Sequence, residues 1–368
     1  MKLIYLTAKQ YPGGGTADHH YIKALAYALH RELGEQFLFI ACNTAQKALP
    51  GLPVRSVAVP SFIKRTVVFF FWLPWFWYAQ PQQRADVFFT NDFNLVLVLS
   101  FWKKLLWLPY KVVSDWHLMT TPGKDRRVIA ASDLCITTSK ALEEGLHTLV
   151  PSAHTKTLYG GVDLSAYPLV RPHNLREALQ LPQGAFLAGY VGLFTTMGME
   201  KGLRTMLRAL TLLPQEVCMV FVGGKDYEIK QYRAYAREEG MEERSIFVPL
   251  QPFSRVVEYE QAVDVLVIPY PDQPHFRRYG FPMKVYEYMA SGTPVVYTTL
   301  PLAQEMLGDC AFGVAPDDAR ALADTLLAIK ADGAEATRRA QHARNKVAGY
   351  TWAAKAQALI QTINDLHA

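Results

Sequence analysis

Apolar runs of strand length alternate along the chain with helix-length segments in which apolar residues recur every three or four positions. Residues 2–8 predict a buried strand, and a glycine-rich turn and a periodic helix follow it. The alternation restarts at 186–193, after a segment rich in Gly, Asp and Pro that is typical of a linker. We therefore expect two α/β domains of Rossmann-like type, 1–168 and 169–349, with the boundary near Pro168.

One aromatic stretch departs from this pattern. Residues 66–79 are almost all aromatic or aliphatic, and no charge lies between Arg65 and Arg84. A membrane-spanning helix needs roughly 20 such residues, and Pro74 interrupts this stretch, so we do not expect it to span. Two interpretations stay open, a helix buried in the N-terminal domain or an element at a membrane surface, where Trp and Tyr favour the headgroup region. A second stretch, 100–110, again combines Trp with Lys.

Composition narrows the class of protein. Half of the 368 residues are hydrophobic, which is enough for a sizeable core in each domain. The 38 Lys and Arg against 33 Asp and Glu give a mild positive charge without a basic run, which argues against nucleic acid and is compatible with a phosphorylated ligand or an anionic membrane surface. The four Cys are scattered without metal-site spacing, and the first apolar run is too short for an export signal. A cytoplasmic protein is expected, with the inner face of the membrane as its peripheral location.

The segment 265–299 holds the strongest candidate for a binding site. It joins a strand, a polar loop, a short helix with Pro at its start and Gly past its end, and a second strand. The unpaired amides of Met283, Lys284 and Val285, together with the positive end of the helix dipole, predict a diphosphate site. Glu287 follows one turn later on the same face, where a carboxylate can accept hydrogen bonds from ribose hydroxyls. An ordinary surface ion pair would show the same spacing.

These residues resemble a known family. The sequence FPMKVYEYMASGTPVV at 281–296 is similar to the donor-site segment of retaining GT-B glycosyltransferases, particularly the large family 4 group. The resemblance extends over nearly the whole chain and implies the GT-B fold, in which two Rossmann-like domains face each other across a cleft and a final helix, here 350–368, crosses back to the N-terminal domain. The chain departs from the family at Tyr279, where many members carry a Glu, and at Leu193, where most carry an Arg.

The resemblance also implies which residues form the site. Lys201 matches a Lys that contacts the donor diphosphate, and His117 follows a strand where the family keeps a His beside the donor sugar; the nearby Asp115 ranks lower. His117, Lys201 and Glu287 are the catalytic candidates. The other donor-site candidates are Gly14, Gly15, Gly192, Met283, Lys284, Val285, Arg277 and Arg278, although the two Arg residues also fit a solvated loop. Asp18, His19 and His20 open a helix and are candidates to meet the acceptor, while Asp18 is equally a good helix cap.

The expected function is that of a retaining hexosyltransferase in polysaccharide biosynthesis, acting on a nucleotide-diphosphate sugar and a glycan or lipid-linked acceptor. Lysines and helix amides would stabilise the departing diphosphate, and the resemblance implies no cofactor and no metal. A nucleotide-sugar 2-epimerase of the same fold and an inactive nucleotide-sugar-binding protein are the alternatives. The sequence does not specify the donor sugar, the base, the acceptor or the oligomeric state.

Overall fold

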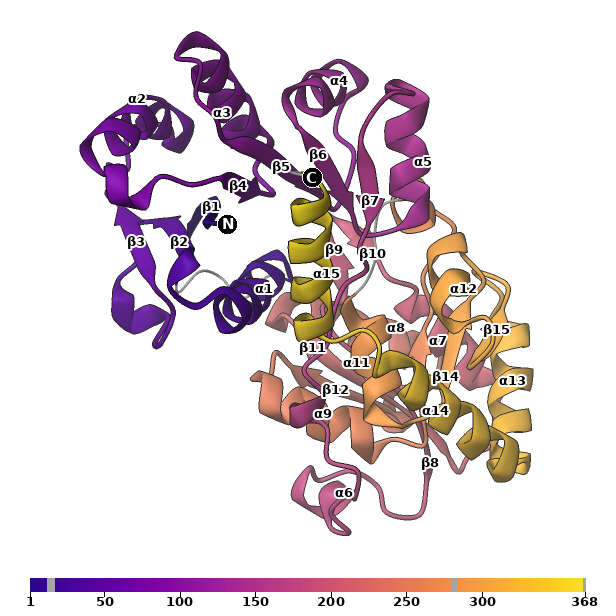
Figure 1. Cartoon of the computed structure of the whole chain (residues 1–368). Coiled ribbons are helices and arrows are strands. Elements are labelled where there is room, and N and C mark those ends of the chain that lie inside the picture. The colour runs from indigo at the N-terminus through magenta and orange to yellow at the C-terminus, as the bar shows by residue number, and fades with distance from the viewer. Residues whose placement is uncertain (12–16, 279–282, 367–368) are drawn as a thin grey trace. The chain divides into compact units, whose positions relative to one another are not determined.

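The chain folds into two compact α/β units, as the computed structural model in Figure 1 shows. Unit 1 consists of Met1–Gly161 with Trp352–Ala368, and unit 2 of Val162–Thr351. The structure describes residues 1–11, 17–278 and 283–366, and for Ala17 and Arg278 only the backbone.

Unit 1 is built on a parallel sheet with the strand order β3-β2-β1-β4-β5-β6-β7. Most of its strands are short apolar runs, because helices cover both faces of a parallel sheet of this kind. The strands are β1 (Leu3–Gln10), β2 (Phe37–Cys42), β3 (Val54–Val57), β4 (Val87–Thr90), β5 (Lys111–Trp116), β6 (Leu134–Thr137) and β7 (Thr155–Thr157). The helices are α1 (Ala17–Leu33), α2 (Arg65–Ala79), α3 (Phe93–Leu105), α4 (Pro122–Ala131), α5 (Lys140–Leu149) and α15 (Trp352–Asp365).

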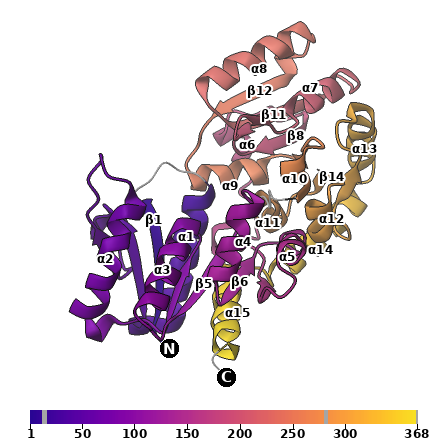
Figure 2. The ribbon, with the colours of Figure 1, turned by 90° about the horizontal axis from the view of Figure 1, so that it is seen from above.

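Unit 2 contains a second parallel sheet, with the order β12-β11-β8-β13-β14-β15. Its strands are β8 (Phe186–Val191), β11 (Val217–Gly224), β12 (Ser245–Pro249), β13 (Val265–Ile268), β14 (Val295–Thr298) and β15 (Phe312–Val314), and β9 (Thr195–Thr196) pairs with β10 (Met199–Glu200). The helices are α6 (Leu175–Ala178), α7 (Leu203–Thr211), α8 (Asp226–Glu238), α9 (Phe253–Ala262), α10 (Pro274–Arg278), α11 (Met283–Ser291), α12 (Pro301–Leu307), α13 (Ala319–Ala331) and α14 (Gly333–Val347). Figure 2 shows α8 against β12, the edge strand.

The two parallel sheets confirm the expected fold class. The chain passes from unit 1 to unit 2 at residues 161–162, ahead of the expected boundary near Pro168, because Tyr167 already packs within unit 2. Its hydroxyl donates to Glu260 Oε2 at 2.9 Å, and its carbonyl accepts from Arg344 at 2.7 Å. The linker composition therefore extends beyond the point at which the chain enters the second unit.

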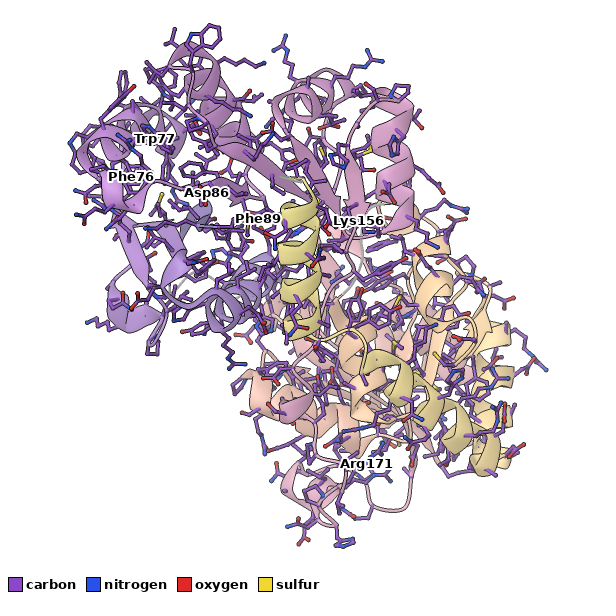
Figure 3. The ribbon with its side chains drawn as sticks, in the orientation of Figure 1. Phe76, Trp77, Asp86, Phe89, Lys156 and Arg171 are labelled. Carbon is purple, nitrogen blue, oxygen red and sulfur yellow. The ribbon has the colours of Figure 1, made fainter. Side chains whose placement is uncertain are left out.

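The aromatic stretch forms α2, and only one side of this helix is buried. Phe69, Leu73, Phe76 and Trp77 enter the core of unit 1, where Figure 3 labels Phe76 and Trp77. The opposite side is exposed to solvent. The interpretation as a helix buried in the N-terminal domain therefore holds for one side of α2 only, because the core of unit 1 covers that side and the other side faces solvent. In the described parts of the chain, no helix has both the length and the hydropathy that crossing a membrane requires.

The last helix, α15, belongs to unit 1 and packs along α1. The Trp352 ring meets the Tyr21 ring edge-on at 5.2 Å. Lys355 Nζ donates to the carbonyls of Leu158 at 2.5 Å and Tyr159 at 2.8 Å. Burial lowers the pKa of Lys355 to about 8, although Asp115 favours its charged form. The helix therefore completes the core of unit 1 from a remote part of the sequence.

Candidate functional site

A buried lysine lies at the carboxyl end of β8 in unit 2. Lys284, on the first turn of α11, is 7% exposed, and its Nζ donates to the Val191 carbonyl at 2.9 Å. The same atom lies 3.8 Å from the centroid of the Tyr190 ring, a cation–π distance. Gly192 has a φ of 142°, and a Cβ at this position would collide with Lys284 Nζ. A side chain at this position would have to displace Lys284, and the burial of Lys284 excludes an ordinary surface ion pair.

The partly buried Lys201 lies near enough to Lys284 for their charges to interact. Burial lowers the pKa of Lys201 to about 8, and Glu228 only partly opposes the shift. Burial also lowers the pKa of Lys284 well below its usual value, and the charge of Lys201 lowers it further. Two lysines thus stand near each other, and the surrounding Glu228, Glu260 and Glu287 only partly offset the lowering of their pKa values. A polyanion such as a diphosphate would supply further negative charge.

Two carboxyl groups also act on Lys284, the partly buried Glu287 and the fully buried Glu260. Burial raises the pKa of Glu287, whereas Lys284 lowers it. The pKa of Glu260 is raised well above its usual value, first by burial and then by the charge of Glu287. Glu260 Oε2 accepts from the Tyr167 hydroxyl at 2.9 Å, while Oε1 is buried without a partner. The environment therefore favours the protonated form of Glu260 more strongly than that of Glu287.

The other donor-site candidates lie at or near the start of α11. Met283 and Val285 stand on its first turn, and Val285 is buried in the core. The exposed Arg277 is paired with Asp272 instead of pointing freely into a site. Gly14, Gly15 and Tyr279 lie outside the described residues, as does the side chain of Arg278.

Unit 1 has a pocket of about 490 Å³ at the carboxyl ends of its central strands. The ends of parallel strands meet at one edge of a sheet, which is where ligands of α/β proteins gather. Most of the residues that line the pocket are polar, and they carry both signs of charge. Its lining residues are Thr7, Ala8, Lys9, Asp18, Arg65, Asn91, Asp92, Phe93, Asn94, Asp115, His117, Leu118, Thr120 and Lys124.

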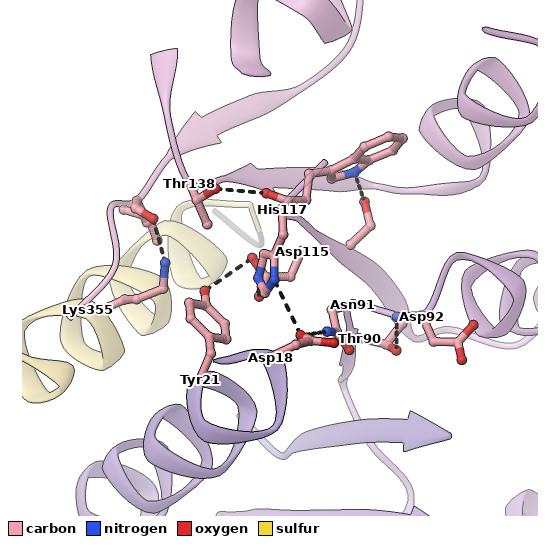
Figure 4. Close-up of polar contacts among 12 residues, drawn as sticks. Asp18, Tyr21, Thr90, Asn91, Asp92, Asp115, His117, Thr138 and Lys355 are labelled. Atoms are coloured by element: carbon pink, nitrogen blue, oxygen red, sulfur yellow. Dashed lines mark hydrogen bonds and ion pairs between the residues drawn. The ribbon is translucent and has the colours of Figure 1, made fainter. Parts of the chain in front are cut away.

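His117 is held between two carboxylates in this pocket (Figure 4). Its Nε2 lies 3.0 Å from Asp115 Oδ2, and its Nδ1 lies 3.5 Å from Asp18 Oδ1. The Tyr21 ring packs edge-on against the imidazole at 4.3 Å, and its hydroxyl donates to Asp115 Oδ1 at 3.4 Å. Burial opposes protonation, but Asp115 and Asp18 outweigh it and raise the pKa of His117 to about 9. His117 is thus an imidazolium near neutral pH.

Asp18 connects His117 to the rest of the pocket. Its carboxylate also pairs with Lys9 Nζ at 2.5 Å and accepts from Asn91 Nδ2 at 2.9 Å. Although burial alone would raise it, the pKa of Asp18 is held well below its usual range by His117 and Lys9. Of the three acceptor candidates, Asp18 lines the pocket, whereas His19 and His20 are not among its lining residues.

The comparisons with known proteins agree with this architecture. The structure of HepE of Anabaena in complex with UDP is similar to this chain, with a TM-score of 0.78 and 18% identity. The alignment covers 100% of the HepE chain and 99% of this chain. Sucrose-phosphate synthase from Thermosynechococcus elongatus aligns over 99% of its chain and 100% of this one, with a TM-score of 0.77 and 21% identity. The chain has the GT-B fold.

Within the GT-B fold, unit 2 carries a further match. Residues 185–332 match the model of the family described as Glycosyl transferases group 1. The D-inositol 3-phosphate glycosyltransferase of Xylanimonas cellulosilytica is 28% identical over 249 residues, which are 64% of this chain. The chain spans 58% of the length of that relative. The family segment contains the two lysines and the glutamate pair described above.

Several residues of these two sites escaped the sequence analysis. Glu260 lies in an ordinary helix and Tyr167 lies in the linker, although both are near Glu287 in space. No motif in the sequence marks either residue. Lys9 and Asn91 directly follow apolar runs of β1 and β4, so their position at strand ends was the available signal.

Proposed function

We propose that this protein is a glycosyltransferase that moves a sugar from a nucleotide-diphosphate sugar bound by unit 2 to an acceptor bound by unit 1. The observation that carries the proposal is the pair of neighbouring lysines, Lys201 and Lys284, whose pKa values are both lowered and which lies near Glu287. The match of residues 185–332 to a glycosyltransferase family covers all three residues. The complex of Anabaena HepE with UDP supports a nucleoside diphosphate as the leaving group.

Each group has a distinct task in this transfer. The bond between the anomeric carbon and the diphosphate breaks, a bond from that carbon to an acceptor hydroxyl oxygen forms, and the hydroxyl proton passes to the departing diphosphate oxygen. Lys201 and Lys284 stabilise the charge that develops on the diphosphate as it departs. Glu287 accepts hydrogen bonds from the ribose hydroxyls and so orients the donor.

The finer features of the reaction follow the family resemblance and the charge of the site. We infer that the sugar is a hexose and that its anomeric configuration is retained. The two lysines supply the positive charge that a metal ion provides elsewhere, so the transfer should proceed in the presence of EDTA. A loss of transfer on chelation that Mg²⁺ restores would contradict this inference.

The acceptor is inferred to be a glycan or lipid-linked precursor of a cell-surface polysaccharide, used at the cytoplasmic face of the membrane. The pocket of unit 1 supports this assignment, because its volume of about 490 Å³ and its many hydrogen-bonding groups suit a polar, hydroxyl-rich molecule. His117 acts there as a fixed positive charge, with its two nitrogens directed at Asp115 and Asp18.

Nucleotide binding is the direct test of the donor site. We would measure the thermal shift and the Kd of the full chain with UDP, GDP and ADP, then repeat both with Glu287→Ala. The matched control is Glu238→Ala, which removes an exposed carboxylate from α8 in the same unit. Stabilisation by one nucleotide that is lost only in Glu287→Ala supports the proposal. An equal response of both variants, or no response of the wild type, contradicts it.

Transfer itself needs a second readout. Release of the nucleoside diphosphate from the sugar donor should depend on the presence of an acceptor glycan. Tight binding of the donor without acceptor-dependent release would instead identify a nucleotide-sugar-binding protein without transferase activity.

A further inference from the structure

The outer side of α2 is apolar although it faces solvent. Val67, Phe71, Trp75 and Tyr78 follow one another at intervals of three or four residues and therefore lie on one side of the helix. Phe71 is 68% exposed and Trp75 is 52% exposed. The inner side is apolar as well, because it belongs to the core. A helix that is apolar on all sides is normally buried on all sides, so something is expected to cover the outer side of α2.

The neighbouring helix α3 extends this surface. Phe101 and Leu105 are exposed on α3, and Trp107, just beyond its end, is 92% exposed. Trp107 has a φ of 54°, a conformation that is uncommon for a bulky residue. Figure 1 shows α3 as a neighbour of α2, and the two helices are in contact. Trp102 Nε1 on α3 donates to the Phe70 carbonyl on α2 at 2.7 Å. We call the following set the α2–α3 apolar face: Val67, Phe71, Trp75, Tyr78, Phe101, Leu105 and Trp107.

The segment of the chain that carries this face has an excess of positive charge. Residues 37–114 contain eight Lys and Arg but only two acidic residues, Asp86 and Asp92, so this segment alone is more positive than the +5 of the whole chain. Asp86 is engaged by the Lys2 amide at 2.6 Å, and Asp92 caps α3. Lys64 and Lys104 are exposed beside the apolar residues.

We propose that the α2–α3 apolar face docks unit 1 onto the surface of an anionic lipid bilayer. Trp and Tyr are the side chains that favour the boundary between headgroups and acyl chains, and the surrounding lysines complement anionic headgroups. A second copy of the chain is a poorer partner, because it would bring the same positive charges against Lys64 and Lys104. Partial insertion of side chains, without a spanning segment, buries the exposed aromatic surface.

The same helices also border the acceptor pocket, which gives the docking a role that rests on the proposed function. Arg65 opens α2, Phe93 and Asn94 open α3, and all three line the pocket of unit 1. Arg65 and Val67 are separated by about 3 Å along the helix axis. An acceptor headgroup in the pocket therefore lies close to the start of the face on which its lipid chain would rest.

Vesicle flotation of the full chain tests the docking without any need for transferase activity. The vesicles are phosphatidylcholine with or without phosphatidylglycerol. The wild type should float with the anionic vesicles, less at high salt and less with phosphatidylcholine alone. Trp107→Ser and Trp75→Ser should each lower the partition coefficient roughly tenfold, the effect of losing one large buried apolar side chain. Tyr227→Ser, at a residue 61% exposed on α8 of unit 2, is the matched control and should float like the wild type.

The possible results separate the alternatives. Trp107 contributes nothing to the core, so the result for Trp107→Ser decides the test even if Trp75→Ser destabilises the fold. Thermal unfolding of Trp75→Ser shows whether it does. Absence of the wild type from the anionic vesicle fraction overturns the proposal. A concentration-dependent dimer that Trp75→Ser abolishes also overturns it, in favour of a second copy on this face. UDP binding is measured in parallel, so that failure of the donor site is distinguished from failure of docking.

Discussion

Lys201 and Lys284 of unit 2 should make the affinity for nucleotide depend on pH. The pKa of Lys201 is about 8 because burial disfavours its charged form. A bound diphosphate favours the ammonium form and raises this pKa again, so binding near pH 8 takes up protons. If only protonated Lys201 binds, the Kd should rise about twofold between pH 7 and pH 8 and about tenfold between pH 7 and pH 9. The phosphates of UDP do not titrate in this range, since their last pKa is near 6.

Isothermal titration with UDP at pH 7, 8 and 9, in buffers of different ionisation enthalpy, measures both the Kd and the number of protons taken up. Lys201→Met should weaken binding at pH 7 and flatten the dependence on pH. Lys201→Arg, whose charge persists above pH 12, should also flatten it while retaining more of the affinity. A wild-type Kd that stays constant from pH 7 to pH 9, without proton uptake, would refute the reasoning.

Three further outcomes are expected. Gly192→Ala should weaken UDP binding at least about tenfold by displacing Lys284, whereas Gly184→Ala, where a Cβ has open space, should not. NMR titration should show the raised pKa of His117, near 9, and Asp115→Asn should lower it. Because the folded pKa is raised, the stability that His117 contributes is complete below about pH 6.5 and is lost as the pH rises through 9. The difference in unfolding free energy between the wild type and His117→Gln should therefore shrink over that window. Arg244→Met should lower the unfolding free energy by about 3 kcal/mol, measured in urea, because this buried guanidinium donates to four backbone carbonyls around the end of α7.

The alternation of elements could be predicted from the sequence because helices and strands of an α/β fold have different apolar periods. The segment 283–298 shows this clearly, since its helix α11 and strand β14 appear where Pro, Gly and the apolar run indicated them. Periodicity failed for α2, where nearly every residue is apolar and no period distinguishes the inner from the outer side. Which side of α2 is buried depends on the tertiary structure alone.

The chemistry of the sites was predictable only in part. Strand ends and helix starts point to His117 and Lys284, since ligand groups gather there in parallel sheets. The charge state of His117 depends on Asp115, two residues away, and also on the remote Asp18, and that of Lys284 depends on the remote Lys201. Nothing local marks such partners, because burial and proximity arise only when the chain is folded.

The return of α15 to unit 1 has a consequence for synthesis on the ribosome. Unit 2 is one continuous segment and can begin to fold as soon as it emerges, but unit 1 needs Trp352 and Lys355 to cover α1 and the end of its sheet. At about 5–20 residues per second, translation of residues 162–351 takes on the order of 10–40 s. During that interval the apolar side of α1 is uncovered, so nascent chains of this length are where a chaperone such as a ribosome-bound holdase should be found.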